Sequence, residues 1–168
     1  MKKKIIILGS TGSIGQNTLK IIRANNKDFS IVLLSTNKNI KKIFNQAKEF
    51  KVKNIIITDI NYYKKAKIKF KRFKINIYND FDSLNKIIKT KNDLIMSSIT
   101  GLNGLSPTLK SIKYTKKILI ANKESIICGW NLIKKNLNKY NTKFIPIDSE
   151  HFSIYELIKN EKSSSIKK

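Results

Sequence analysis

The residues best suited to hold a phosphate group lie near the N-terminus, in the stretch ILGSTGSIGQ at positions 7–16. Three of the chain's six glycines, Gly9, Gly12 and Gly15, follow one another at intervals of three, with hydroxyl side chains between them. Glycine lets a backbone turn tightly and approach a pyrophosphate closely, and free amides at the start of a helix attract anions. The spacing differs from the Gly-x-Gly-x-x-Gly fingerprint, so an ordinary strand-to-helix turn stays an alternative to a dinucleotide-binding turn.

A second polar segment that bears on such a site follows the second expected strand, in STNKNIKK at positions 35–42. Enzymes that use NAD carry an acidic residue near this point, which binds the ribose 2′-hydroxyl. Here Asn37, Lys38 and Asn39 stand in its place, without an acid. A carboxylate would repel a 2′-phosphate whereas a lysine attracts it, so the segment favours NADP over NAD. The alternative is that Lys38 is one solvated lysine among many.

Two later strand ends carry charged residues that could act on a substrate or a cation. ANKES places Asn122, Lys123 and Glu124 after one strand. IDSEH places Asp148 and Glu150 after the last strand. Two carboxylates this close can bind one hard cation if the backbone turns between them. Two ligands make an incomplete metal site, so a solvated loop stays the alternative.

These segments must be positioned by strands that alternate with helices along the chain. Apolar runs rich in Ile, Leu and Val predict strands, and the segments between them show helical spacing of apolar residues. This alternation predicts a Rossmann-like, doubly wound α/β fold, with a mostly parallel sheet and helices on both faces. One short helix is expected over residues 62–71, and another is expected to begin at Asp82 or Ser83. The expected strands cover residues 4–8, 29–36, 54–58, 73–79, 93–99, 117–121 and 143–148.

The composition is strongly basic, with a formal net charge of +24. Arg23 and Arg72 are the two arginines among 35 basic residues, so 33 are lysines, and these spread along the whole chain. Base readout and bidentate phosphate contacts use arginine, so we attribute the charge to a bias toward Lys, Asn and Ile and expect no specific nucleic-acid partner. No apolar run reaches the ~18 residues of a membrane span, and a single cysteine cannot form an internal disulfide. We therefore expect a cytoplasmic protein without a membrane partner.

Four segments taken together are similar to one known family. LGSTGSIGQNTL, TGLNGLSPTL, ILIANKESII and PIDSEH, in this order, closely resemble the 1-deoxy-D-xylulose 5-phosphate reductoisomerase family. The resemblance implies an enzyme of non-mevalonate isoprenoid biosynthesis that rearranges this sugar phosphate and reduces the resulting aldehyde with NADPH. The product would be 2-C-methyl-D-erythritol 4-phosphate. The resemblance also implies a divalent ion, Mn²⁺ or Mg²⁺, and a homodimer in the full-length family.

The same resemblance assigns roles position by position. Lys123 and Ser149 match catalytic residues that meet the substrate, and Asp148 and Glu150 match two metal ligands. The family usually has glycine where this chain has Asn37. The positions that match cofactor contacts are Thr11, Gly12, Ser13, Ile14, Asn37, Lys38, Asn39, Asn122 and Glu124.

Members of this family are considerably longer than this chain, so the resemblance implies that parts of the site lie beyond residue 168. Those parts include the third metal-binding carboxylate, the residues for the substrate phosphate and the lid over the site. We therefore expect residues 1–147 to form an NADPH-binding domain and residues 148–168 to begin an α+β catalytic domain. We also expect that this chain alone does not turn over the substrate.

Two other functions stay open on the residues alone. A dehydrogenase-like or epimerase-like protein would carry a Tyr-x-x-x-Lys pair, and YKKAK offers Tyr63 and Lys67, but this pair lies early, before the later main strands. The other function is non-catalytic nucleotide binding, or nucleic-acid binding by a basic protein. NADPH binding that survives moderate salt would favour the reductoisomerase, whereas polyanion binding that salt abolishes would favour nucleic acid.

Overall fold

The structure is a computed structural model that describes residues 1–147 and 149–158, with the backbone alone at residues 149–151. Each strand leads into a helix or a helical turn. The strands are β1 (Lys3–Leu8), β2 (Phe29–Thr36), β3 (Asn54–Ile57), β4 (Asn76–Tyr78), β5 (Asn92–Ser97), β6 (Thr115–Ile120) and β7 (Lys143–Pro146). The helices are α1 (Ser13–Ala24), α2 (Ile40–Glu49), α3 (Ile60–Lys69), α4 (Leu84–Ile87), α5 (Leu105–Ile112), α6 (Lys123–Tyr140) and α7 (Ser149–Ile158), with 3₁₀ turns at Phe81–Ser83 and Leu102–Gly104.

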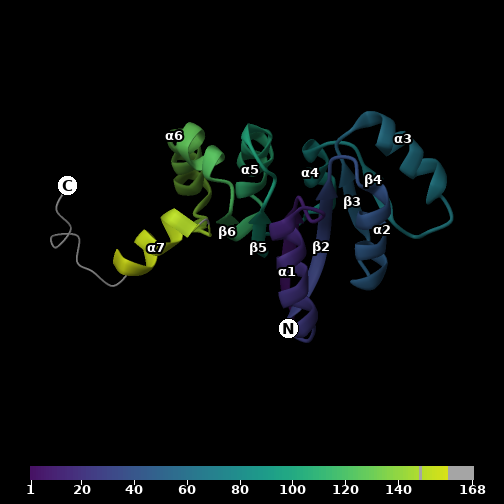
Figure 1. Ribbon diagram of the computed structural model, residues 1–168, viewed down its shortest axis with the longest axis horizontal. Helices are drawn as coiled ribbons and strands as arrows, with labels where there is room; N and C mark the ends of the chain where they lie inside the picture. The colour runs from purple at the N-terminus through teal and green to yellow at the C-terminus, as the bar shows by residue number, and fades with distance from the viewer. Residues whose placement is uncertain (148, 159–168) are drawn as a thin grey trace.

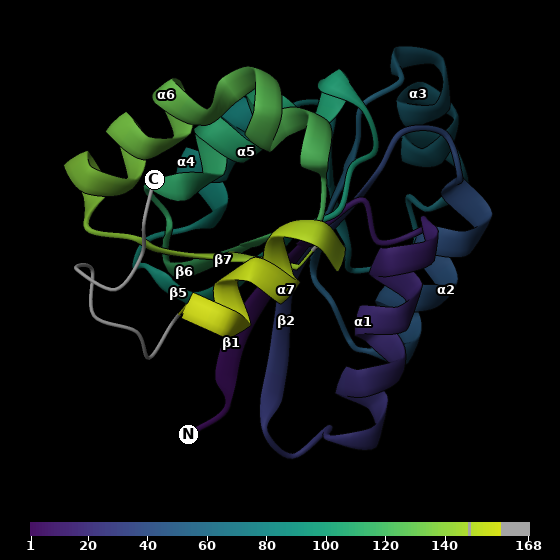
Figure 2. The ribbon, with the colours of Figure 1, turned by 60° about the vertical axis from the view of Figure 1, so that its left-hand side comes forward.

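Helices cover both faces of one sheet. Helices α1 and α2 lie on one side of the strands, and α4, α5 and α6 lie on the other (Figure 1). Helix α7 follows the edge strand β7 and contacts it, and the turned view brings α7 to the front (Figure 2). The strands are therefore sandwiched, which explains why they read as continuous apolar runs in the sequence.

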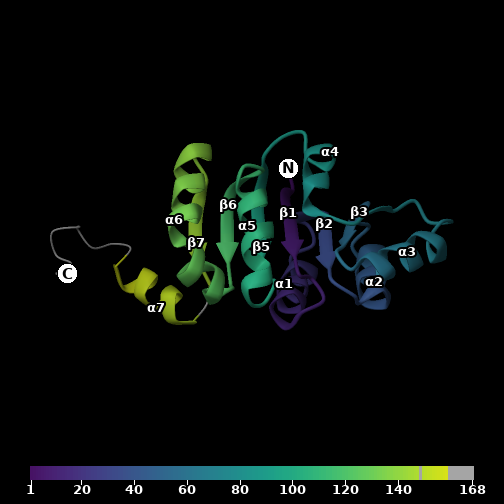
Figure 3. The same cartoon turned by 90° about the horizontal axis from the view of Figure 1, so that it is seen from above.

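The described strands form a single parallel sheet in the order β4-β3-β2-β1-β5-β6-β7. Seen from above, β1 lies near the middle, with β2 and β3 on one side and β5, β6 and β7 on the other (Figure 3). The chain moves outward from β1 to β4, returns to the centre for β5, and moves outward again to β7. This is the predicted doubly wound arrangement, and it separates the connections that leave β1 and β5 at their carboxyl ends.

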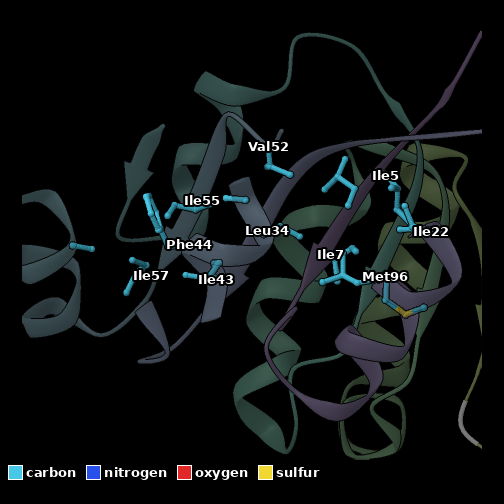
Figure 4. Close-up of a cluster of buried hydrophobic side chains, with 14 of the residues drawn as sticks. Ile5, Ile7, Ile22, Leu34, Ile43, Phe44, Val52, Ile55, Ile57 and Met96 are labelled. Carbon is cyan, nitrogen blue, oxygen red and sulfur yellow. The ribbon is translucent and has the colours of Figure 1, made fainter. Parts of the chain in front are cut away.

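Two clusters of buried side chains fill the space between the sheet and its helices. Ile5 and Ile7 belong to the cluster beneath α1 and α2, which also contains Leu34 and Ile43 (Figure 4). Ile6 and Leu8 belong to the cluster on the opposite face. Successive strand side chains point to opposite faces, so one apolar run serves both clusters. Strand β1 is thereby fixed at the centre, and the turn that follows it is held in place.

Strand β4 is shorter than the sequence predicted. It covers Asn76–Tyr78, whereas alternating apolar residues predicted a strand over residues 73–79. Phe73 lies in a turn before the strand, and its amide donates to the carbonyl of Phe70 at 2.9 Å. The Phe73 ring packs edge-on against Phe44, with 4.7 Å between ring centroids. The alternation of apolar residues therefore extends beyond the strand, because Phe73 packs against the core from the preceding turn.

Of the two predicted cap residues, Ser83 does precede α4, but the helical segment begins earlier than predicted. Asp80 caps the preceding 3₁₀ turn, because its Oδ1 accepts a hydrogen bond from the amide of Ser83 at 3.0 Å. The 3₁₀ turn therefore begins two residues before Ser83, and Ser83 caps α4 with no side-chain bond. Several acidic and hydroxyl residues in a row made the cap ambiguous in the sequence.

Candidate functional site

A crevice opens at the carboxyl edge of the sheet, where β1, β2, β3 and β5 end. It encloses about 190 Å³ and lies where the two halves of the sheet diverge, which is where open α/β sheets bind ligands. A hollow of about 520 Å³ continues from it and adds Asn103 and Pro107. The crevice is lined by Gly9, Thr11, Gly12, Ser35, Thr36, Asn37, Thr58, Phe81, Ser98, Ile99 and Thr100.

The three glycines of the first turn differ in whether the protein's own packing requires glycine there. Gly9 has a φ of +80°, and a Cβ there would lie 2.8 Å from the carbonyl oxygen of Ser98. A Cβ on Gly15 would lie 2.4 Å from the carbonyl oxygen of Gly9, because α1 packs directly on the turn. Gly12 has extended backbone, and a Cβ there would find its nearest neighbour at an ordinary 3.4 Å. The protein itself could accommodate a side chain at Gly12, so its absence leaves room in the crevice for a ligand.

Helix α1 begins at this turn without a side-chain cap. Gly12 occupies the N-cap position and has no side chain to accept a bond from the first-turn amides. The amides of residues 13–15 therefore have no partner within the helix, and the first turn carries no acidic side chain. Gln16 braces the turn, donating from Nε2 to the carbonyl oxygens of Thr11 at 3.1 Å and Gly12 at 3.2 Å. Uncapped amides and the positive end of the helix dipole can together hold the phosphates of a nucleotide.

A network of buried groups fixes the shape of the turn, and sequence reasoning missed it. The amide of Gly9 donates to the Oγ of Ser35 at 2.9 Å, and the amide of Ser10 donates to the carbonyl of Ser35 at 2.9 Å. Gln46, on the buried face of α2, forms two hydrogen bonds with Ser10. Ser35 directly follows the apolar run Ile31–Leu34 near the end of β2, which was the available signal. Gln46 offered none, because glutamine is common on helix surfaces.

The predicted cofactor residues of the first turn lie at the crevice. Thr11 lines it, and its Oγ1 is 2.7 Å from the Oγ1 of Thr36 at the end of β2. Ser13 and Ile14 are the first two residues of α1, and both are exposed. Their amides belong to the uncapped helix start. The side chain of Ser13 and the backbone around it therefore face solvent-accessible space beside the crevice.

The segment after β2 carries two further predicted cofactor residues. Asn37 lines the crevice and donates from Nδ2 to the Oγ1 of Thr58 at 2.9 Å. Its φ is not positive, so asparagine occupies this position without the backbone strain that would require glycine. Asn39 accepts a hydrogen bond from the amide of Lys42 and caps α2. These two side chains fix the loop between β2 and α2.

Lys38 projects from this loop and is 62% exposed. Its Nζ lies 3.9 Å from a carboxylate oxygen of Asp59, which follows β3. The other oxygen of Asp59 accepts the amides of Asn61 and Tyr62 at the start of α3. An exposed ion pair this long contributes little, so a phosphate group could replace it as the partner of Lys38.

The end of β6 brings the third group of predicted residues to the same edge. Asn122 is only 4% exposed, and its Oδ1 caps α6 by accepting an amide of the first turn. Its Nδ2 donates to the carbonyl oxygens of Ile99 and of Gly101, the latter at 2.6 Å. This amide therefore holds the 99–101 loop that borders the crevice. Lys123 and Glu124 are the first two residues of α6, and both are exposed.

The predicted metal ligands belong to the last strand end. Strand β7 pairs with β6 as far as Pro146, so the chain leaves the sheet at the edge where Lys123 begins α6. Asp148 lies outside the described residues, and so do the side chains of Ser149 and Glu150. Among the side chains that the structure describes, no group of three or more His, Cys, Asp or Glu gathers to hold a metal ion.

The Tyr-x-x-x-Lys pair lies away from the crevice. Tyr63 and Lys67 are on α3, which packs against β3 and β4, and neither residue lines the crevice. The Nζ of Lys67 lies 6.0 Å from the centroid of the Tyr63 ring. The pair therefore cannot act on a ligand bound between β1 and β5. In the described part of the chain, no helix has the length and apolarity needed to cross a membrane.

Comparison with known sequences supports the resemblance. Residues 5–129 match the 1-deoxy-D-xylulose 5-phosphate reductoisomerase family. The reductoisomerase of Pelagibacter ubique is 56% identical over 168 residues, which cover 99% of this chain and 43% of that protein. The reductoisomerase of Thermotoga maritima is 34% identical over 161 residues, which cover 95% of this chain and 41% of that protein. The chain thus spans less than half the length of these relatives.

Solved structures agree with this assignment. The reductoisomerase of Zymomonas mobilis in complex with NADPH aligns with a TM-score of 0.81 at 30% identity, covering 90% of this chain and 40% of that one. A reductoisomerase in complex with NADPH, fosmidomycin and magnesium aligns with a TM-score of 0.83 at 33% identity, covering 92% and 38%. A homoserine dehydrogenase from Thermoplasma acidophilum, at 19% identity and a TM-score of 0.51, shares the fold alone. The chain belongs to the 1-deoxy-D-xylulose 5-phosphate reductoisomerase family.

Proposed function

We propose that this chain is the NADPH-binding part of a 1-deoxy-D-xylulose 5-phosphate reductoisomerase. The observation that carries the proposal is the open Gly12 at the uncapped start of α1. The protein leaves the first-turn amides without helix partners there and omits a side chain that it could accommodate. A nucleotide diphosphate uses both features, because it needs close approach and N–H donors. Relatives solved with NADPH support the choice of nucleotide.

The chain's own residues divide the cofactor between two places. The amides of residues 13–15, with Thr11 and Gly12 beside them, suit the diphosphate. Lys38, between Asn37 and Asn39, suits the 2′-phosphate. Its ion pair with Asp59 is long, at 3.9 Å, so a phosphate group can replace Asp59 as its partner. Asn122 and Glu124 border the same edge from α6. When bound, NADPH supplies the hydride of the reduction, and these residues bind and orient it.

Titration of the chain with NADPH and NADH at moderate salt tests this proposal. We expect NADPH to bind at least about tenfold more tightly than NADH, a difference of about 1.4 kcal/mol. Lys38→Met should remove most of the preference, whereas Lys135→Met, an exposed lysine on α6, should leave it unchanged. Equal binding of the two nucleotides, or binding of any polyanion that disappears with salt, would contradict the proposal and favour a nucleic-acid binder.

We infer roles for the remaining predicted residues from their place after β6 and β7. The Lys123 ammonium would supply positive charge and hydrogen bonds to substrate oxygens, and Ser149 would meet the substrate beside it. Asp148 and Glu150 offer the hard oxygen donors that suit Mn²⁺ or Mg²⁺. Mn²⁺ titration followed by electron spin resonance should show weaker binding by Asp148→Asn, with Asp28→Asn as the control. Unchanged binding by Asp148→Asn would refute its role as a ligand.

The full activity is a proposal for the whole protein. The reaction would convert 1-deoxy-D-xylulose 5-phosphate to 2-C-methyl-D-erythritol 4-phosphate with NADPH and a divalent ion. Residues 1–147 would form the cofactor domain, since β7 closes the sheet at Pro146, and residues 148–168 would begin the catalytic domain. We expect this chain to bind NADPH without turning over the sugar phosphate. NADPH oxidation that depends on added substrate would overturn that expectation.

The remaining inferences concern partners and location. We propose that the full-length protein forms a homodimer in the cytoplasm and has no specific nucleic-acid or membrane partner. The lysines support only the absence of a specific nucleic-acid partner, because they spread along the chain and do not form one block. Light scattering of the full-length protein measures its mass in solution, and cell fractionation locates it. A monomeric mass, or recovery with membranes, would contradict the corresponding statement.

A further inference from the structure

One buried side chain of α2 holds the glycine turn from outside. The Oε1 of Gln46 accepts a hydrogen bond from the hydroxyl of Ser10 at 2.8 Å. Its Nε2 donates to the carbonyl oxygen of Ser10 at 2.9 Å. Ser10 is fully buried and Gln46 is only 8% exposed, so water does not compete for either bond. A single amide therefore satisfies both the side chain and the carbonyl of one residue in the turn, 36 positions away in the sequence.

Ser10 sits where the shape of the turn is decided. It follows Gly9, whose φ of +80° reverses the chain, and it comes two residues before the open Gly12. Its amide is held by the carbonyl of Ser35. With Gln46 in place, every polar group of Ser10 is bonded to another part of the protein. Without it, the Ser10 hydroxyl would keep only its longer contact to the carbonyl of Ser35, at 3.3 Å. The buried carbonyl of Ser10 would lose its bond from Gln46, and the turn would rearrange to reach another donor.

Helix α2 also connects the two ends of the proposed cofactor site. Its N-cap is Asn39, which directly follows Lys38, and Gln46 lies about 10 Å further along the axis of the same helix. The buried side chains of Ile43 and Ala47 anchor the helix to the sheet. Helix α2 begins next to Lys38 and contacts Ser10 through Gln46. It therefore fixes the position of Lys38 relative to the glycine turn.

We propose that Gln46 is a positioning residue, whose amide clamps Ser10 and thereby holds the amides of α1 in the arrangement that receives the NADPH diphosphate. Gln46 touches no part of the crevice itself and acts through Ser10. This inference rests on the proposed function. The physical effect is preorganisation of the turn. If the turn adopts the NADPH-binding conformation only part of the time, its affinity for NADPH falls in proportion to that fraction.

The test compares ligands that do and do not use the turn. Gln46→Leu keeps the size of the side chain and removes both hydrogen bonds. If it lowers the competent fraction of the turn to about a tenth, the Kd for NADPH rises about tenfold. The Kd for adenosine 2′-monophosphate, which has no diphosphate, should stay within about twofold because Lys38 is untouched. Ser10→Ala, which keeps the Nε2 bond to the carbonyl, should have a smaller effect on NADPH.

Asn54→Leu is the matched control for lost stability. Asn54 also donates its side-chain amide to a backbone carbonyl, that of Val32 at 3.2 Å, in a partly buried position at the amino end of β3. It should lower Tm as Gln46→Leu does and leave the Kd for NADPH unchanged. Unchanged NADPH binding by Gln46→Leu, or equal losses for both ligands, would overturn the inference. Failure of the unsubstituted chain to bind NADPH would instead overturn the proposed function.

Discussion

The two ends of the carboxyl edge differ in how completely the chain satisfies its own groups. At the β1–β2 end, Ser10, Ser35 and Gln46 are buried, and their polar groups bond to one another. At the β6–β7 end, a groove of about 410 Å³ between α6, β7 and α7 is lined almost entirely by apolar side chains. Trp130 lines it while 38% exposed, and no segment among the described residues covers it.

The contrast shows which end of the sheet edge is held in shape by contacts among the described residues. The β1–β2 end is held by hydrogen bonds among the described residues themselves. The β6–β7 end places Lys123 at the start of the helix that carries an apolar surface of the kind that marks an interaction site. We therefore expect changes to the buried contacts at the first end to alter both stability and cofactor binding, and changes on the apolar surface to alter neither.

The largest effect should come from filling the contact between α1 and the turn. A Cβ on Gly15 would lie 2.4 Å from the carbonyl oxygen of Gly9 and 2.6 Å from the Cα of Ser10, so backbone must move. Gly15→Ala should lower the free energy of unfolding by about 3 kcal/mol and abolish NADPH binding. Urea unfolding measures the first and titration the second. Gly101→Ala is the control for crowding: its Cβ would meet open space, and the strain of its φ of +67° should cost only about 1 kcal/mol.

Gly12 should separate binding from stability. A Cβ there has no neighbour closer than 3.4 Å, and its backbone is extended, so Gly12→Ala should cost less than about 1 kcal/mol in unfolding free energy. The added methyl would occupy the space that the diphosphate needs, and the Kd for NADPH should rise about tenfold or more. A Kd unchanged by Gly12→Ala would mean that the ligand does not approach this turn.

Most of the strands and helices could be predicted from the sequence, because buried parallel strands and the helices between them have characteristic local patterns of apolar residues. The run Ile5 to Leu8 predicted a buried strand, and the two core clusters confirm that both of its faces are buried. The glycine turn was found from spacing and from the helix that follows. Its neighbours across the sheet could not be found, because pairing of β1 with β2 and β5 depends on the order of strands in space.

The candidate site was only partly predictable for the same reason. Asn37 and Lys38 were predicted because they follow a strand, as the carboxyl edge of a parallel sheet requires. Gln46 and Asp59 were missed because their roles arise from contacts 36 and 21 residues away along the chain. A polar residue on a helix face has the same pattern whether it meets solvent or a buried serine. Tertiary contacts of this kind leave no local signal.

A smaller effect is expected at the amino edge of the sheet, away from both regions. Asp93 accepts the amide of Lys4 at 2.9 Å and the ammonium of Lys116 at 2.8 Å. The bond from Lys116, followed by that from the Lys4 amide, holds the pKa of Asp93 below its ordinary value of 3.8. Asp93→Asn should therefore lower the free energy of unfolding at neutral pH by about 0.5 kcal/mol, since the carboxylate is partly exposed.

The pH dependence of this difference has a definite sign. A carboxyl whose pKa is lowered by folding stabilises the protein above its unfolded value of 3.8, and the contribution is lost as the pH falls through the folded pKa. Unfolding curves of the two proteins should separate near pH 7 and converge in acid below 3.8. A gap that persists in acid would show that the hydrogen-bond geometry, and not the charge, is responsible.

The smallest effect should come from the apolar groove. Ile127 and Ile154 line it and are 68% and 57% exposed, so each replacement by serine should change the free energy of unfolding by less than about 0.5 kcal/mol. NADPH binding should not change, because neither residue lies near the crevice. Ile133→Ala is the control on the same helix: its side chain is fully buried, and it should lose about 2 to 4 kcal/mol. A loss above about 1 kcal/mol for Ile127→Ser would mean that the chain's own segments fill the groove, and the difference between the two ends would disappear.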